Sequence, residues 1–198
     1  MISTYKIKPT FQQLLMPLLK FLKKLGCTPN LLTILAIILS FYLGYLFLDA
    51  PLNTDNYLFV ALGLILRMML NALDGMMARI YDMKSRSGEV LNEIGDVVSD
   101  IAIFYPLMFL SGLDCKLAFG FIVLSIVNEF CGILSKAMGA GRRYDGPMGK
   151  SDRATVVGAL CLLFYFDIEV QEYLNYIFIT ILLLVSLSSI IRLKHAIK

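Results

Sequence analysis

The 198-residue sequence has no tryptophan, one histidine and few charged side chains, which make up 17% of the residues. Soluble domains have about 25% charged and about 45–50% apolar residues. Here 58% of the residues are hydrophobic and the mean hydropathy is +0.75. The net charge of +3 gives no strong field of one sign. These deficits exclude a soluble enzyme, a disordered chain and a protein with nucleic acid as its partner.

Disulfide and zinc frameworks are also missing. The four cysteines, Cys27, Cys115, Cys131 and Cys161, are far apart and form no CxxC pair. This spacing, with a single histidine in the chain, does not indicate a zinc site, so we interpret them as small apolar side chains. The length suits one compact bundle and leaves no room for a second large domain.

Long apolar runs dominate what is present. A helix needs about 20 mostly apolar residues to cross the bilayer core. Six stretches qualify, and their unbroken length argues against strands. They run from about Asn30 to Leu48, Tyr57 to Ile80, Gly88 to Leu110, Leu117 to Met138, Ala154 to Phe166 with its flanks, and Tyr173 to Ile191. We therefore predict an all-α integral membrane bundle of six transmembrane helices.

The segment before the first span has a different pattern. Between Thr10 and Leu25, leucines recur at helical spacing and lysines follow at Lys20, Lys23 and Lys24. This pattern predicts an amphipathic helix in the membrane interface, with a short soluble helix as the alternative. We expect a single domain over residues 1–198, with the interfacial helix in 1–27 and the bundle in 28–198.

Basic residues predict the orientation. Five precede the first span, three lie in the second connection, five in the fourth and three in the C-terminal tail, whereas the first and fifth connections have none. Lysine and arginine are enriched in cytoplasmic loops. We expect a bacterial inner-membrane protein with both termini and any site near these loops on the cytoplasmic side.

Polar side chains gather on the second and third spans, where charges are costly and therefore functional candidates. Two groups share a helix face through spacings of three and four residues: Asn71, Asp74, Gly75 and Ala78 in the second span, and Gly88, Asn92, Asp96 and Asp100 in the third. Two antiparallel helices joined by a short loop can turn these faces toward each other. The spacing thus predicts a pocket of carboxylates and amides near the cytoplasmic end.

Such hard oxygen ligands suit Mg²⁺, Mn²⁺ or Ca²⁺, and Arg79 at the mouth is placed to bind a phosphate. One alternative is that Asp74 and Asp96 only form ion pairs with Arg67 or Arg79. Another is a proton relay or small transporter, which the one-sided polar groups and the lack of an inverted repeat disfavour. We expect Arg67 and Glu129 to form a buried ion pair between the second and fourth spans.

The stretch over residues 71–96 reads NALDGMMARIYDMKSRSGEVLNEIGD. It resembles the signature of the CDP-alcohol phosphotransferases: Asp, two residues, Asp-Gly, two residues, Ala-Arg, eight residues, Gly, three residues, Asp, three residues, Asp. Asp74-Gly75, Ala78-Arg79, Gly88 and Asp96 match, while Asn71 and Asn92 replace the first and third aspartates. Thr28-Pro29-Asn30 and Thr33 resemble the family's start of the first span.

The resemblance implies transfer of a phosphatidyl group from a CDP-lipid, CDP-diacylglycerol, to a small alcohol, with release of CMP. It implies one or two Mg²⁺ or Mn²⁺ ions on Asp74 and Asp96, with Asn71 and Asn92 as weaker ligands, and Asp96 as the proton acceptor. The CDP site would be shaped by Asn30, Thr33, Gly75, Ala78, Arg79 and Gly88. Only the resemblance indicates a homodimer.

The two asparagines halve the charge of the expected metal site. Glu93 or Asp100, each within one turn of a matched position, could compensate. The alternative is a catalytically silent relative that binds CDP-lipid without turnover.

The loop GAGRRYDGPMGKSDRATVV, between the fourth and fifth spans, predicts the acceptor. Its basic residues Arg142, Arg143, Lys150 and Arg153, with Arg192 on the same side, are typical of phosphate binding. We therefore favour a phosphorylated alcohol, glycerol 3-phosphate first and inositol phosphate second. Gly149-Lys150 is similar to phosphatidylglycerophosphate synthases, and Asp152-Arg153 with Arg192 to phosphatidylinositol phosphate synthases. The alternative is a loop that only anchors topology and touches anionic membrane lipids.

Overall fold

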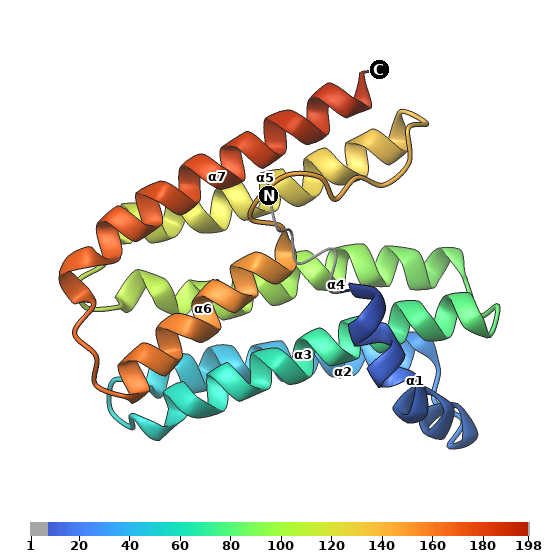
Figure 1. Ribbon diagram of the computed structural model, residues 1–198, viewed down its shortest axis with the longest axis horizontal. Coiled ribbons are helices and arrows are strands. Elements are labelled where there is room, and N and C mark those ends of the chain that lie inside the picture. Colours follow the sequence, from blue (N-terminus) through green and yellow to red (C-terminus); the bar gives the residue numbers. More distant parts are fainter. Residues whose placement is uncertain (1–7, 198) are drawn as a thin grey trace.

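The computed structural model describes residues 8–197 and contains only helices and connections over that range, which confirms the predicted all-α fold (Figure 1). The helices are α1 (Lys8–Lys24), α2 (Pro29–Asp49), α3 (Asp55–Ile80), α4 (Arg86–Phe104), η2 (Tyr105–Phe109), α5 (Cys115–Ala137), α6 (Lys150–Tyr165), η3 (Gln171–Tyr173) and α7 (Leu174–Ala196). Each predicted span therefore corresponds to one long helix, with η2 continuing the third and η3 preceding the sixth.

The helices form a bundle with a distinct pair on one side. Figure 1 shows α5 and α7 side by side along one edge, α2 and α3 along the other, and α4 and α6 between them. The turn between α3 and α4, the connection between α5 and α6 and the C-terminus lie toward the same end of the bundle as α1. The segments rich in lysine and arginine are thus gathered at one end of the bundle.

Four stretches are long and apolar enough to cross a membrane among the described residues: α2, α3, α5 and Gln171–Ala196. They make the chain an integral membrane protein. The other two helices differ for physical reasons. Helix α4 carries five charged side chains, and the 16 residues of α6 span about 24 Å, less than the bilayer core of about 30 Å. The count of six spans stays a prediction.

Helix boundaries follow from local chemistry. Helix α2 begins at Pro29, and its first turn is capped by Thr28, whose hydroxyl accepts a hydrogen bond from the Leu31 amide at 3.3 Å. Helix α4 ends at Phe104 rather than at the predicted Leu110, because Pro106 has no amide hydrogen and forces the chain into η2.

Helix α1 packs one apolar face against the end of the bundle that holds the basic segments. Leu15 and Leu19 are buried against Leu73, Met76 and Met77 of α3. Other apolar residues of α1 and two of its lysines are exposed, namely Leu14, Leu18, Phe21, Lys20 and Lys24, and so is Leu25 directly after the helix. This division, with apolar and basic residues both open to the surroundings, supports the predicted interfacial helix.

The backbones of α2 and α4 approach each other closely at Gly44. A methyl group on Gly44 would clash with the backbone carbonyl of Ala102, which cannot move away without shifting α4. We expect Gly44→Ala to lower the free energy of unfolding by about 1–3 kcal/mol, the usual range for overpacking. Thermal unfolding of the purified protein in detergent measures this loss.

The matched control is Gly120→Ala on α5, where the added methyl group would meet only Leu182 at 3.7 Å, an ordinary contact. Alanine is the better helix former, so this variant should be as stable as the native chain or more stable by up to about 1 kcal/mol. Equal stability of the two variants would contradict the close approach.

Candidate active site

A cavity of about 1040 Å³ lies between the facing sides of α2, α3, α4 and α6, close to the turn that joins α3 to α4. It is lined by most of the residues singled out from the sequence: Asn30, Thr33, Asn71, Asp74, Gly75, Ala78, Arg79, Gly88, Asn92, Asp96, Lys150 and Arg192. The cavity therefore brings together all four signature positions on α3 and α4. Arg142, Arg143 and Arg153 are not among its lining residues.

Asp74 is held in place by α2. Its side chain is buried, and the Thr33 hydroxyl donates a hydrogen bond to Asp74 Oδ2 at 2.9 Å. The next residue, Gly75, leaves room for Arg79, whose Nη1 would lie 3.1 Å from a Cβ added at Gly75. Thr33, expected in the CDP site, thus also orients a carboxylate of the cavity.

Gly88 fits because two polar side chains approach its backbone. An added Cβ would lie 2.6 Å from Asn30 Oδ1 and 2.8 Å from Ser85 Oγ. Ser85 caps α4 by accepting a hydrogen bond from the Gly88 amide at 3.0 Å. The start of α4 and the amide of Asn30 therefore meet at the cavity wall.

Two ion pairs link α4 to α6, one turn apart. At the cavity, the Lys150 ammonium group contacts the Asp96 carboxylate. One turn deeper, Arg153 Nη2 lies 3.2 Å from Asp100 Oδ2, and Arg67 of α3 binds the other oxygen of Asp100 at 2.7 Å. The first pair is partly accessible, whereas the second is buried. We refer to the two pairs as the α4–α6 ladder.

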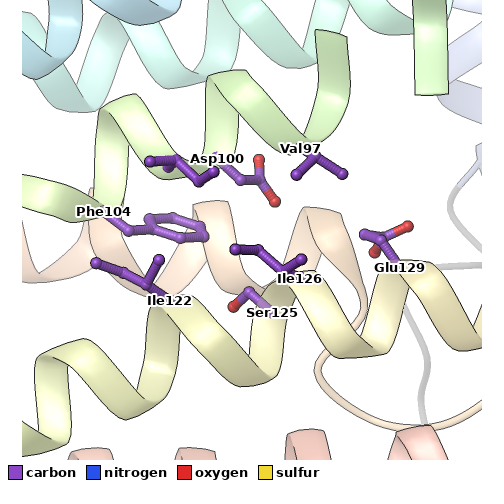
Figure 2. Close-up of a pocket in the computed structure, with 8 residues that line it drawn as sticks. Val97, Asp100, Phe104, Ile122, Ser125, Ile126 and Glu129 are labelled. Atoms are coloured by element: carbon purple, nitrogen blue, oxygen red, sulfur yellow. The ribbon is translucent and has the colours of Figure 1, made fainter. Parts of the chain in front are cut away.

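The inner rung of this ladder belongs to a larger group of charges, which we call the arginine cluster. Four arginines and three carboxylates from α3, α4, α5, α6, α7 and the α5–α6 connection interlock at the inner side of the cavity, which three of them, Arg67, Glu129 and Arg192, also line. The cluster comprises Arg67, Arg142, Arg153, Arg192, Glu93, Asp100 and Glu129. Figure 2 shows Asp100 and Glu129 at a crevice between α4 and α5 whose other labelled residues are mainly apolar.

Arg153 is the centre of the cluster and has no exposed surface. Its Nη2 binds Asp100 and also Glu129 Oε1, at 3.0 Å, while its Nη1 donates to Asn128 Oδ1 at 3.2 Å. One guanidinium group therefore joins α4, α5 and α6. Because charges in an apolar interior are tolerated only with partners, this arrangement fixes how the three helices are rotated.

Arg142 and Arg192 close the cluster on the other side. Arg142 binds Glu93 through two bonds of 2.9 and 3.0 Å and Glu129 through one of 2.7 Å. Burial lowers the pKa of Arg142, but these carboxylates outweigh it and hold that pKa above its ordinary value. Arg192 donates to the backbone carbonyl of Asn128 at 2.7 Å and lies 3.6 Å from Glu129.

The predicted ion pair between Arg67 and Glu129 is wrong: Arg67 binds Asp100, and Glu129 binds three other arginines. Glu93 and Asp100, considered as substitutes for the missing aspartates, are bound by arginines and do not line the cavity. Charged residues inside apolar spans indicated that ion pairs form within the bundle. Their spacing along one helix did not identify which residues of the other helices they bind.

The two signature carboxylates are not bound by arginines. Asp74 accepts from Thr33 and Asp96 pairs with Lys150, and within residues 8–197 neither forms an ion pair with Arg67 or Arg79. The alternative, in which both aspartates only form ion pairs with Arg67 or Arg79, is therefore wrong.

The lining residues fit a hard divalent cation. Two carboxylates, of Asp74 and Asp96, and two side-chain amides, of Asn71 and Asn92, face one cavity and offer the oxygen ligands that Mg²⁺ and Mn²⁺ prefer. In the described part of the chain, no group of three or more His, Cys, Asp or Glu side chains is placed to hold a metal. Of the four oxygen-donating side chains at the cavity, only the two carboxylates are charged, so the proposed ligand set has a charge of only −2.

Taken together, the fold and the site define a helical membrane protein with a cavity at one end of the bundle that is lined by carboxylate, amide and basic side chains. The sequence profile of the CDP-alcohol phosphatidyltransferases matches residues 27–190, and the chain belongs to this family. The resemblance found in the signature is thereby confirmed.

Curated relatives include the inner membrane protein YnbA of Escherichia coli, which is 42% identical over 79% of this chain and 77% of its own length. The archaetidylinositol phosphate synthase of Pyrococcus horikoshii is 26% identical over 77% and 78% of the two chains. The fold is that of the phosphatidylinositol phosphate synthase of Mycobacterium tuberculosis solved with CDP-DAG bound, with a TM-score of 0.74, 22% identity, and coverage of 91% and 92% of the two chains. The same enzyme has also been solved with manganese and citrate.

Proposed function

We propose that this protein transfers a phosphatidyl group from CDP-diacylglycerol to a phosphorylated alcohol and releases CMP. The observation that carries the proposal is that all four signature positions, together with Lys150, line one cavity. The reaction would take place at the cytoplasmic face of a bacterial inner membrane, with the lipid chains remaining among the helices and the bilayer lipids.

The nucleotide end of the CDP-lipid would lie at the junction of α2, α3 and α4. Gly75, Ala78 and Gly88 allow the substrate to approach the helix backbones, and Asn30 offers an amide at the same wall. The Arg79 guanidinium, exposed at the mouth, is suited to bind a phosphate of the diphosphate.

Asp74 and Asp96, with the amide oxygens of Asn71 and Asn92, would hold Mg²⁺ or Mn²⁺. Such an ion neutralises the diphosphate and acts as a Lewis acid when it is bound. Asp96 is also the group proposed to take the proton from the acceptor hydroxyl, since a carboxylate within hydrogen-bond reach can act as a general base.

Lys150 and Arg192 are the basic lining residues on the acceptor side of the cavity. A neutral alcohol would need no such charges, so we propose a phosphorylated acceptor. Glycerol 3-phosphate and an inositol phosphate both satisfy this requirement. The archaeal relative is an archaetidylinositol phosphate synthase and the mycobacterial neighbour is a phosphatidylinositol phosphate synthase, which favours an inositol phosphate as the acceptor. Arg142 and Arg153, considered for the same role, would act only by holding the surrounding helices. Arg143, considered with them, pairs with Asp145 at a partly exposed position.

An acceptor screen tests the proposal. We expect CMP release from CDP-diacylglycerol to require Mg²⁺ or Mn²⁺ and to rise with a phosphorylated alcohol, while inositol, serine and buffer alone give only the background rate. The measurement is CMP formed by the purified protein in detergent, checked by mass spectrometry of the lipid product.

The two asparagines, Asn71 and Asn92, motivate a second candidate function, which is binding of the CDP-lipid without turnover. A protein that binds CDP-diacylglycerol but forms no CMP with any acceptor or either ion would be a catalytically silent relative. The same screen applied to Asn71→Asp with Asn92→Asp then shows whether the two amides are the cause.

A further inference from the structure

The cavity has half of the negative charge that its signature would carry with four aspartates. Asn71 and Asn92 occupy two of the four positions and add oxygen atoms but no charge. Neighbouring carboxylates do not replace it. Asp100 is bound by two arginines, and Glu89, at the edge of the cavity, pairs with Lys136. Glu93, and Glu129 at the cavity wall, are bound within the arginine cluster, and the carboxylate of Asp152, also at the wall, accepts a hydrogen bond from the Gly149 amide at 3.0 Å.

A positive charge of the chain itself stands beside this centre. Lys150, the outer rung of the α4–α6 ladder, contacts the Asp96 carboxylate and lines the cavity. The first turn of α6, which carries Lys150, is held in position because Arg153, one turn further along α6, forms ion pairs with Asp100 and Glu129. The ammonium group is therefore built into the site rather than borne on a mobile loop.

The charge balance decides how many ions such a centre can take. Two carboxylates, one ammonium group and one divalent cation leave a net charge of +1, so a second divalent cation would enter a centre that is already positive. Coulomb repulsion between close charges is strong where protein shields them from water. With aspartates also at positions 71 and 92, the two added negative charges would offset the repulsion of the second cation by the first cation and Lys150.

We propose, resting on the function proposed above, that this centre binds one divalent cation and that Lys150 supplies the positive charge a second ion would bring to the diphosphate. Asp74 and Asp96 provide the charged ligands of that single ion. Lys150 thus has a role toward the CDP-lipid that is separate from binding the acceptor's phosphate.

Titration with Mn²⁺, followed by electron paramagnetic resonance of the purified protein without lipid substrate, counts the ions. We expect one Mn²⁺ per chain, with the spectrum of an isolated ion. The variant Asn71→Asp with Asn92→Asp should bind two Mn²⁺ with magnetic coupling between them. Asn53→Asp, in the connection between α2 and α3, adds a carboxylate elsewhere and should still bind one.

The role of Lys150 is tested by the affinity of the single ion. Lys150→Met keeps the length of the side chain and removes its charge, so Mn²⁺ should bind at least about tenfold more tightly. Lys150→Arg keeps the charge and should bind Mn²⁺ as the native chain does. If Lys150 served the acceptor alone, Lys150→Met would raise the KM for the acceptor and leave the Mn²⁺ affinity unchanged.

Two coupled ions in the native chain, no bound ion at all, or an unchanged Mn²⁺ affinity in Lys150→Met would each overturn the inference. CMP release measured on the same preparations separates it from the proposed function. One ion without CMP release leaves the inference standing and rejects the transferase activity. CMP release with two ions rejects the inference alone.

Discussion

Asp96→Asn is expected to reduce CMP release by about 10²–10⁴-fold, the usual contribution of a general base. The substitution preserves the size of the side chain but removes the group proposed to accept the hydroxyl proton. It also removes one of the two charged ligands that line the cavity and the partner of Lys150. The rate of CMP formation at saturating CDP-diacylglycerol and acceptor measures the loss.

The matched control is Asp55→Asn, the same chemical change in the first turn of α3, at the far end of the helix that carries Asp74. This variant should keep at least half of the native rate. If Asp96→Asn kept more than a tenth of the native rate while remaining folded, Asp96 would be neither the base nor an essential ligand.

Arg153→Met is expected to destabilise the protein by about 3 kcal/mol, near the lower end of the range for breaking a buried ion pair. The side chain is fully buried and binds carboxylates on two different helices, Asp100 and Glu129. These carboxylates keep other arginine partners, which is why the loss falls at the lower end. Thermal unfolding of the native protein and the variant, at the same lipid and detergent concentrations, measures the change.

Arg143→Met serves as its comparison. Arg143 belongs to the same basic loop, but its ion pair with Asp145, at 3.8 Å, is more than a third exposed on both sides. Exposed ion pairs contribute about 0–1 kcal/mol. Equal melting temperatures for the two variants would show that the arginine cluster does not hold the helices together.

The helices and the cavity could be predicted from the sequence because both depend on periodicity along one chain segment. Apolar length located the long helices, and spacings of three and four residues placed Asp74 and Asp96 on faces that meet. Local exceptions came from single residues. Pro106 shortened α4, and α6 begins at Lys150, where the Asp152 carboxylate accepts a hydrogen bond from the Gly149 amide at 3.0 Å.

The pairing of charges could not be predicted, because it depends on how neighbouring helices are rotated and shifted along their axes. Lys150 and Arg153 are only three residues apart and were expected to bind the same ligand. They occupy successive rungs of the ladder, so one lines the cavity and the other is sealed behind it. Which arginine binds Asp100 is likewise set by the packing of three helices rather than by any local pattern.

The contact between α1 and α3 has a consequence for where a lipid substrate meets the protein. Leu15 and Leu19 rest on Leu73, Met76 and Met77, the residues on either side of Asp74 and Gly75. If α1 lies at the level of the lipid phosphate groups, as its amphipathic pattern predicts, the proposed reaction centre lies at that level as well. A diphosphate linked to two acyl chains would reach that centre by sliding sideways within the leaflet, without being lifted out of it.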